Sequence, residues 1–242
     1  MPVIVHVGLH KTGSTWLQQE VLPNLVDVAY LPGRPARRWL AGIVSGAPVA
    51  PTFDPPRAPT VVWSSEELAG FLWDPIDPEV AAQRLASALP GASILLFTRE
   101  PEAWRSSVYA QYVNEGGYRS TASFWAAVPV ACTGTEPERV IEAFQRSFAV
   151  VHVLRYEDVR ADAGAVAERV AALCGTTLRA PVSAQVHNRS LSRPVRQVLR
   201  VWNRLFRRSR FNPSPLLPMR GAVRMRGFLQ RRIDPRVPER WR

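Results

Sequence analysis

Four short runs of apolar, often β-branched residues recur along the chain, and segments with a helical spacing of apolar residues separate them. Such runs are typical of buried strands, and strands that alternate with helices predict βαβ units around a mainly parallel sheet. We therefore expect an α/β fold in three layers, with helices on both faces of the sheet and right-handed crossovers. The expected strands are 3–7, 61–63, 93–98 and 150–154, and the expected helices are 15–25, 78–89, 102–114, 137–148 and 163–174.

Polar residues gather directly after each expected strand. They occupy 11–15, 64–67, 99 and 156–158. Ligands of open parallel sheets bind beyond the carboxyl ends of the strands, which meet at one edge of the sheet. These four clusters therefore predict one ligand site at that edge.

The length of 242 residues suits one sizeable α/β domain with its own core. We expect this domain to cover residues 1–192, and residues 193–242 to form a basic helical extension of it. Residues 31–60 are rich in Pro and Arg and have little periodicity, which predicts an irregular segment. Cys132 and Cys174 lie in no metal-binding spacing, so we expect buried thiols.

The positive charge is concentrated in the C-terminal fifth of the chain. Residues 193–242 contain 15 Arg and two acidic residues, a net charge of +13, which leaves −2 of the total of +11 for residues 1–192. Such asymmetry predicts an anionic partner. From residue 195 to residue 208, apolar residues share one helical face and arginines occupy the rest. We expect this helix to dock on the core with a solvated basic face, to lie on an anionic membrane surface, or to cover an anionic acceptor.

No apolar run reaches the roughly 18 residues that a membrane-spanning helix needs, and the first residues lack the charged region of a secretion signal. The sequence therefore predicts a cytoplasmic protein, with peripheral membrane association as the alternative. A nucleic-acid partner is not expected, because no aromatic and basic recognition motif accompanies the arginines. The four histidines are scattered without the pairing of a metal site, so no metal is expected either.

A single lysine, Lys11, stands among 30 arginines. It lies with Gly8 and Gly13 in a loop between an expected strand and an expected helix, the setting in which backbone N–H groups bind phosphate. Lys11 adds a full charge, and Ser14 and Thr15 add hydroxyl donors. In the nucleoside triphosphate loop GxxxxGK[ST] the lysine follows the second glycine, whereas Lys11 precedes Gly13. The fold expected is therefore P-loop-like, and a P-loop-type kinase or nucleotide triphosphatase is the alternative function.

Residues 6–18, HVGLHKTGSTWLQ, resemble the 5′-phosphosulfate-binding loop of sulfotransferases that use 3′-phosphoadenosine 5′-phosphosulfate (PAPS), especially the bacterial and carbohydrate-type branch. The resemblance implies sulfuryl transfer from PAPS to a hydroxyl or amine by in-line displacement, with 3′-phosphoadenosine 5′-phosphate (PAP) as product. It also implies that the lysine approaches the oxygen that bridges to sulfur. The donor-binding residues implied in this loop are Lys11, Thr12, Gly13, Ser14, Thr15 and Trp16.

A second motif follows the third expected strand, where Arg99 is followed eight residues later by Ser107. An arginine at a strand end can bind a phosphate bidentately, and a serine in the next helix can donate its hydroxyl to the same group. The pair resembles the 3′-phosphate-binding motif of the family, which implies that role for both residues. The RKGxxG-type loop of the cytosolic branch is not found in the sequence. Residues 187–192, with Arg189 and Ser190, are expected to replace it or to be a plain connection.

Transfer requires a base that removes the acceptor's proton. Glu66, in the SSEE segment after the second expected strand, is our choice, and carbohydrate-type relatives have a similar segment with a glutamate base. Glu67 and His10 are the alternatives, and carboxylates at this point can also cap a helix. Catalysis is therefore assigned to Lys11 and Glu66. The acceptor, a carbohydrate, a lipid or a small metabolite, stays open.

Overall fold

The computed structural model describes residues 2–31, 34–47, 57–69, 73, 76–127, 137–182, 192–219, 225 and 228. The chain divides into two compact units, one from Met1–Pro101 and Pro129–His187 and the other from Glu102–Val128 and Asn188–Arg242. The first unit carries the sheet, and the second is built from helices where it is described. The expected domain over 1–192 with an extension over 193–242 stays a prediction; in the structure, residues 102–128 group with the C-terminal segment.

The first unit contains a five-stranded sheet in which every neighbouring pair is parallel, which confirms the expected α/β class. The strand order is β2-β3-β1-β4-β5, so that β1 lies in the centre. The carboxyl ends of all five strands consequently meet at one edge of the sheet. The strands are β1 (Val3–Gly8), β2 (Val28–Leu31), β3 (Thr60–Ser65), β4 (Ser93–Thr98) and β5 (Val151–Arg155).

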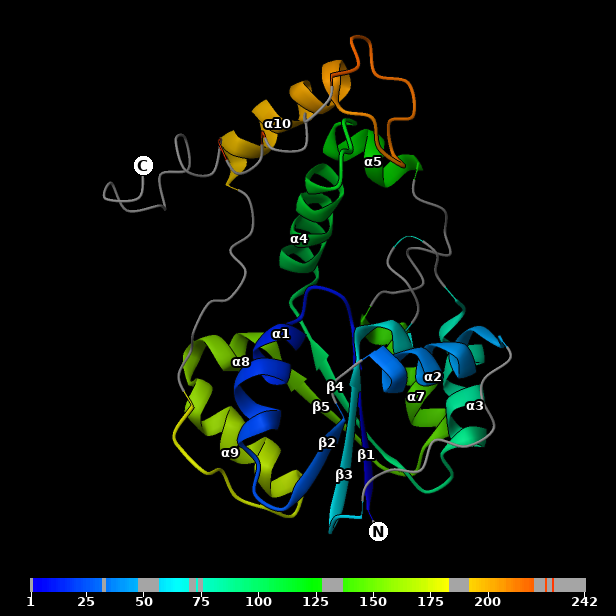
Figure 1. The fold of residues 1–242 in the computed structure, drawn as a ribbon, viewed down its shortest axis with the longest axis vertical. Helices are drawn as coiled ribbons and strands as arrows, with labels where there is room; N and C mark the ends of the chain where they lie inside the picture. Colours follow the sequence, from blue (N-terminus) through cyan, green and yellow to red (C-terminus); the bar gives the residue numbers. More distant parts are fainter. Residues whose placement is uncertain are drawn as a thin grey trace. The chain divides into compact units, whose positions relative to one another are not determined.

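Side chains of β1 alternate between two cores, one on each face of the sheet. Val5 and Val7 belong to the first core, and Ile4 belongs to the second. Figure 1 shows α2, α3 and α7 on one face of the sheet and α1, α8 and α9 on the other. The three-layer arrangement predicted from the alternation of strands and helices is therefore present. The helical bounds are α1 (Ser14–Trp16), η1 (Leu17–Val21), η2 (Leu22–Asn24), α2 (Arg34–Ser45), η3 (Glu66–Ala69), α3 (Pro78–Ala88), α7 (Pro137–Ser147), α8 (Tyr156–Ala161) and α9 (Ala163–Leu173).

The prediction that residues 31–60 are irregular is wrong for much of this segment. Strand β2 ends at Leu31, and α2 follows as a regular helix of 12 residues. Leu40 and Val44, four residues apart, are fully buried in the first core. Four residues span about one helical turn, so this short apolar stripe is enough to anchor α2 on the sheet. Because the first half of α2 is rich in Pro and Arg, its composition does not indicate this apolar stripe.

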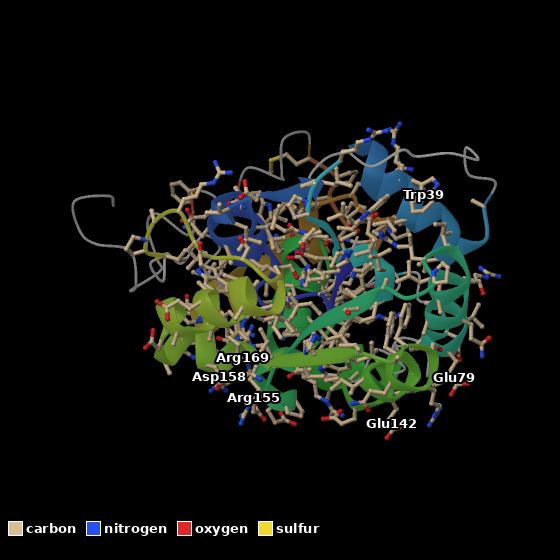
Figure 2. All side chains as sticks on the ribbon, turned by 90° about the horizontal axis from the view of Figure 1, so that it is seen from below. Trp39, Glu79, Glu142, Arg155, Asp158 and Arg169 are labelled. Atoms are coloured by element: carbon tan, nitrogen blue, oxygen red, sulfur yellow. The ribbon has the colours of Figure 1, made fainter. Side chains whose placement is uncertain are left out.

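The layer of α3 and α7 is fixed at its outer surface by charge pairs. Figure 2 shows the side chains of Glu79 in α3 and Glu142 in α7 at the outside of this layer. Arg146 of α7 pairs with both carboxylates. Asp77 caps α3 by accepting from the backbone N–H of Glu79 at 2.8 Å. These charges join one helix to the other, so we assign them a structural role.

The second unit is described in three helices, α4 (Pro101–Asn114), α5 (Thr121–Ala127) and α10 (Arg193–Phe206). Asn203 of α10 is fully buried, and its side-chain amide donates to the carbonyls of Val113 and Gly117 at 2.7 and 2.9 Å. The ring of Phe124 in α5 packs on Tyr112 in α4, with centroids 4.4 Å apart. The unit is therefore held by contacts between segments that are distant in sequence. Among the described residues, no helix is long and apolar enough to cross a membrane.

Candidate functional site

The loop after β1 is tightly turned and closely packed. Lys11 and Gly13 both have a positive φ, of 70° and 103°. The Thr12 hydroxyl donates to the carbonyl of Leu9 at 2.6 Å, so this side chain holds the turn. A Cβ atom at Gly8 would lie 2.7 Å from the Ser14 hydroxyl oxygen. Glycine is therefore required where the strand enters the loop.

Ser14 opens the helical segment after this loop, and its hydroxyl is buried. The oxygen has no hydrogen-bond partner among the residues that the structure describes. Burying a hydroxyl without a partner is unfavourable, so an unpaired one beside a glycine loop indicates a place for a ligand. Thr15 is half-buried at the next position.

The Trp16 side chain turns away from the loop into the second core. Its indole packs edge-on against Phe97, with centroids 6.5 Å apart. Its backbone N–H donates to the carbonyl of Gly13 at 2.9 Å. A donor contact by Trp16 stays a prediction, and the packing shown here is structural.

Arg99, at the end of β4, reaches the loop after β1. Its Nη1 donates to the backbone carbonyl of Lys11 at 3.1 Å, and its guanidinium lies 4.8 Å from the centroid of the Tyr156 ring. The same ring covers Gly13, where a Cβ atom would approach Tyr156 to 2.7 Å. The Arg99 Nε is buried and has no hydrogen-bond partner in the described part of the chain. Two motifs that are distant in sequence thus form one cluster, held together by the first residue of α8.

Ser107 lies in the second unit, where it is buried in α4. Arg99 belongs to the first unit. The expected pairing of the two residues on one phosphate therefore stays a prediction. Residues 187–191, expected as a replacement for a 3′-phosphate loop, lie outside the described residues.

Glu66 and His10 form a pair at the ends of β3 and β1. His10 Nδ1 lies 3.4 Å from Glu66 Oε2. Burial raises the pKa of Glu66, but the hydrogen bond from His10 and the electrostatic interactions with His10, His6 and Lys11 outweigh it, and the net result is a lowered pKa. Glu66 is therefore ionised at neutral pH, and it feels the charge of the lysine in the neighbouring loop.

The other candidate base, Glu67, occupies the second residue of η3. Its backbone N–H donates to the Ser65 hydroxyl at 3.2 Å, which is the capping geometry expected at a helix start. Of the three candidates, the structure brings Glu66 and His10 together.

A buried polar network below this pair was not predicted. His6 of β1 pairs in register with Ser64 of β3, and its Nδ1 lies 2.7 Å from the Ser64 hydroxyl. Gln18 donates to the same hydroxyl at 3.0 Å. Burial lowers the pKa of His6 to about 4, although the charge of Glu66 opposes this shift. The imidazole is therefore neutral at physiological pH and supports the strand ends as a hydrogen-bonding group. The one signal in the sequence was a histidine inside an apolar strand.

Among the described residues, no group of three or more His, Cys, Asp or Glu side chains could hold a metal ion. Of the two cysteines, Cys174 is buried and free, and burial raises the pKa of its thiol to about 11. In the described part of the chain, the site brings together the Lys11 ammonium, the Arg99 guanidinium, the buried Ser14 hydroxyl and the His10–Glu66 pair.

Comparison with known proteins identifies a structural likeness. No protein-family model matches the chain, and no curated protein matches it in sequence. Among solved structures, the crystal structure of a sulfotransferase from Alicyclobacillus acidocaldarius is similar, with a TM-score of 0.57 and 18% sequence identity. The match covers 78% of this chain and 87% of that protein. The chain therefore shares the fold of that protein.

Proposed function

We propose that this protein is a sulfotransferase that moves the sulfuryl group of PAPS to a hydroxyl or amine, in the manner of the bacterial and carbohydrate-type branch. The observation that carries the proposal is the contact between Arg99 and the carbonyl of Lys11. It joins the two segments that resemble the 5′- and 3′-phosphate-binding motifs of PAPS enzymes. The shared fold with a sulfotransferase agrees with this assignment.

The residues of the loop fit a phosphate. The buried Ser14 hydroxyl and the buried Arg99 Nε have no hydrogen-bond partner among the described residues, and anionic oxygens would satisfy both. A side chain at Gly8 or Gly13 would collide with Ser14 or Tyr156, so the glycines preserve the tight turn of this loop. Lys11, Ser14 and Thr15 would hold the 5′-phosphosulfate, and Arg99 with Ser107 the 3′-phosphate.

PAPS supplies the sulfuryl group and a phosphate leaving group, so the task of the protein is positioning and charge stabilisation. The ammonium of Lys11 would stabilise the negative charge that grows on the leaving phosphate oxygen. A preorganised donor of this kind is typically worth about 3–4 kcal/mol of activation free energy. The lysine lies on the same side of the sheet edge as Glu66, whose pKa its charge helps to lower.

The base is the pair of Glu66 and His10. A carboxylate with a lowered pKa is a weak base at neutral pH, whereas an imidazole oriented by a carboxylate is well suited to accept a proton. Glu66 would accept from His10 Nδ1 and leave Nε2 to take the acceptor's proton. As the new bond to sulfur forms, that proton passes to the pair, and the electrons of the breaking sulfur–oxygen bond remain on the phosphate oxygen near Lys11.

Nucleotide-dependent thermal stability tests the proposal. PAP should raise the unfolding temperature, whereas ATP with Mg²⁺ should have little effect, because the loop lacks the lysine position of a triphosphate site. Labelled PAPS and a panel of sugars, lipids and small metabolites should then reveal transfer. Magnesium-dependent ATP hydrolysis without PAP binding would overturn the proposal in favour of a kinase or triphosphatase.

A further inference from the structure

Two apolar residues of α10 face solvent. Val198 and Val201 are 44% and 56% exposed, whereas Val195, Leu199 and Asn203 form the buried side of the helix. With about 3.6 residues per turn, the two exposed valines lie on a different side of the helix from these three. Packing among the described residues of the second unit therefore leaves about half of each of these two side chains exposed.

The segment after α10 adds three exposed apolar side chains at the end of this helix. Leu216, Leu217 and Met219 are 65%, 62% and 48% exposed. Their backbone N–H groups donate to carbonyls in the last turn of α10, at 3.3, 2.7 and 3.1 Å. The backbone thus fixes the segment along the helix while its side chains stay in solvent. We call Val198, Val201, Leu216, Leu217 and Met219 the apolar edge.

Arginines accompany the apolar edge without compensating acids. Residues 192–219 contain seven Arg and neither Asp nor Glu. Two of these arginines are engaged within the unit, since Arg196 donates to Ser106 and Arg207 to the carbonyl of Asn114. The exposed arginines of this segment are Arg193, Arg204, Arg208 and Arg210.

We propose that the second unit binds an anionic lipid surface through the apolar edge and these exposed arginines. Exposed Leu, Val and Met side chains can enter the boundary between headgroups and acyl chains, while guanidinium groups bind lipid phosphates. A nucleic acid would complement the charge of the arginines, but it would leave Leu216 and Leu217 without a function. The combination of apolar and cationic groups therefore favours a membrane surface over a polyanion. This binding is independent of the chemistry at the strand ends.

Vesicle co-sedimentation with the full chain tests this proposal. The protein should bind vesicles of phosphatidylcholine mixed with phosphatidylglycerol, should bind pure phosphatidylcholine vesicles at least about tenfold more weakly, and should lose affinity as salt rises. The double variant Leu216→Ser/Leu217→Ser and the single variant Arg204→Glu should each weaken binding by about tenfold. Val150→Ser and Arg169→Glu make matched changes at exposed positions of the first unit and should leave binding unchanged.

The unfolding temperature of each variant checks its fold without reference to enzymatic activity. Equal binding to both kinds of vesicle, or binding to neither, would overturn the proposal. It would also be overturned if Arg204→Glu abolished binding to duplex DNA while Leu216→Ser/Leu217→Ser had no effect on vesicle or DNA binding, because that result would identify a polyanion as the partner.

Discussion

The guanidinium of Arg99 donates to the backbone carbonyl of Lys11 at 3.1 Å. The two residues follow β4 and β1, which are neighbours in the sheet, with Gly8 in register with Phe97. Because Arg99 also lies over Tyr156, whose ring covers Gly13, it supports the backbone of the loop in addition to offering charge. The residue that we propose for the 3′-phosphate therefore also supports the loop that we propose for the 5′-phosphosulfate.

Replacement of Arg99 by Lys should selectively remove recognition of the 3′-phosphate. A lysine keeps the charge but lacks the planar fork that can bind the Lys11 carbonyl and a phosphate together. We expect PAP affinity to fall by about 10- to 100-fold, consistent with the loss of charge-assisted hydrogen bonds, and AMP affinity to change much less. Calorimetric titration with both nucleotides measures the difference. An equal loss for PAP and AMP would assign Arg99 to loop support alone.

Substitutions of Lys11 should distinguish the contribution of its ammonium group to catalysis from that of its positive-φ backbone conformation. Lys11 has a φ of 70°, which glycine adopts readily, so Lys11→Gly removes the ammonium without adding strain. We expect Lys11→Gly and Lys11→Ala to lose transfer by about 100-fold or more, and Lys11→Arg to restore little of it because a guanidinium is planar and larger. Single-turnover rates with labelled PAPS test this order. Full activity of Lys11→Arg would refute the need for a compact ammonium.

The His10–Glu66 pair should determine how turnover depends on pH. A base must be unprotonated, so turnover should rise as pH rises along the acid limb of the profile. Glu66→Gln removes the carboxylate that orients His10, so the plateau rate should fall by about 10- to 100-fold. PAP affinity should change little. Glu67→Gln is the matched control. If it shows these effects while Glu66→Gln does not, the base assignment moves by one residue.

His6 should make the stability of the first unit depend on pH. Its pKa is lowered from 6.5 to about 4 in the folded chain, so the unfolded chain binds the proton first as pH falls. The free energy of unfolding should therefore decrease between about pH 6.5 and pH 4, by on the order of 3 kcal/mol, and this contribution should level off below pH 4. Urea titrations across this range should show a weaker dependence in His6→Leu.

Alanine substitutions at Gly13 and Gly91 distinguish the cost of backbone strain from the cost of a steric clash with a neighbouring side chain. Both have a positive φ, but a Cβ atom at Gly13 would approach Tyr156 to 2.7 Å, whereas one at Gly91 would meet nothing within 4 Å. Gly91→Ala should cost about 1–2 kcal/mol of stability through backbone strain and leave PAP binding intact. Gly13→Ala should cost more and should remove the stabilisation by PAP. Similar stability losses for the two variants would show that the Tyr156 ring moves aside.

The sequence predicts strands best where they are buried on both faces. The central β1, β3 and β4 have continuous apolar runs, and their bounds differ little from the predicted ones. The edge strand β2 is short and half-buried, and α2 has a narrow apolar stripe, so neither produces a clear pattern. Strand β5, at the other edge of the sheet, is nevertheless predicted to within one residue at each end, because its valines form a recognisable β-branched run.

For the site, the sequence predicts which loops matter but not which side chains touch. The contact of Arg99 with Lys11, of Tyr156 with Gly13 and of His10 with Glu66 all join different strand ends, and each depends on the order of the strands in the sheet. His6 and Ser64 meet only through the register of β1 and β3. These relationships are tertiary, so no spacing within one segment could reveal them.

The buried amide of Asn203 has a consequence for how the chain is made. The side-chain amide of Asn203 donates to backbone carbonyls 90 and 86 positions earlier, and the backbone carbonyl of Asn203 accepts from the side chain of Asn212 at 2.7 Å. During synthesis, α4 and α5 must therefore wait until residues 203–212 have left the ribosome before these hydrogen-bond partners exist. A premature stop codon shortly after residue 192 would leave these helices with unsatisfied carbonyls and an uncovered apolar side, a product that proteases would readily degrade.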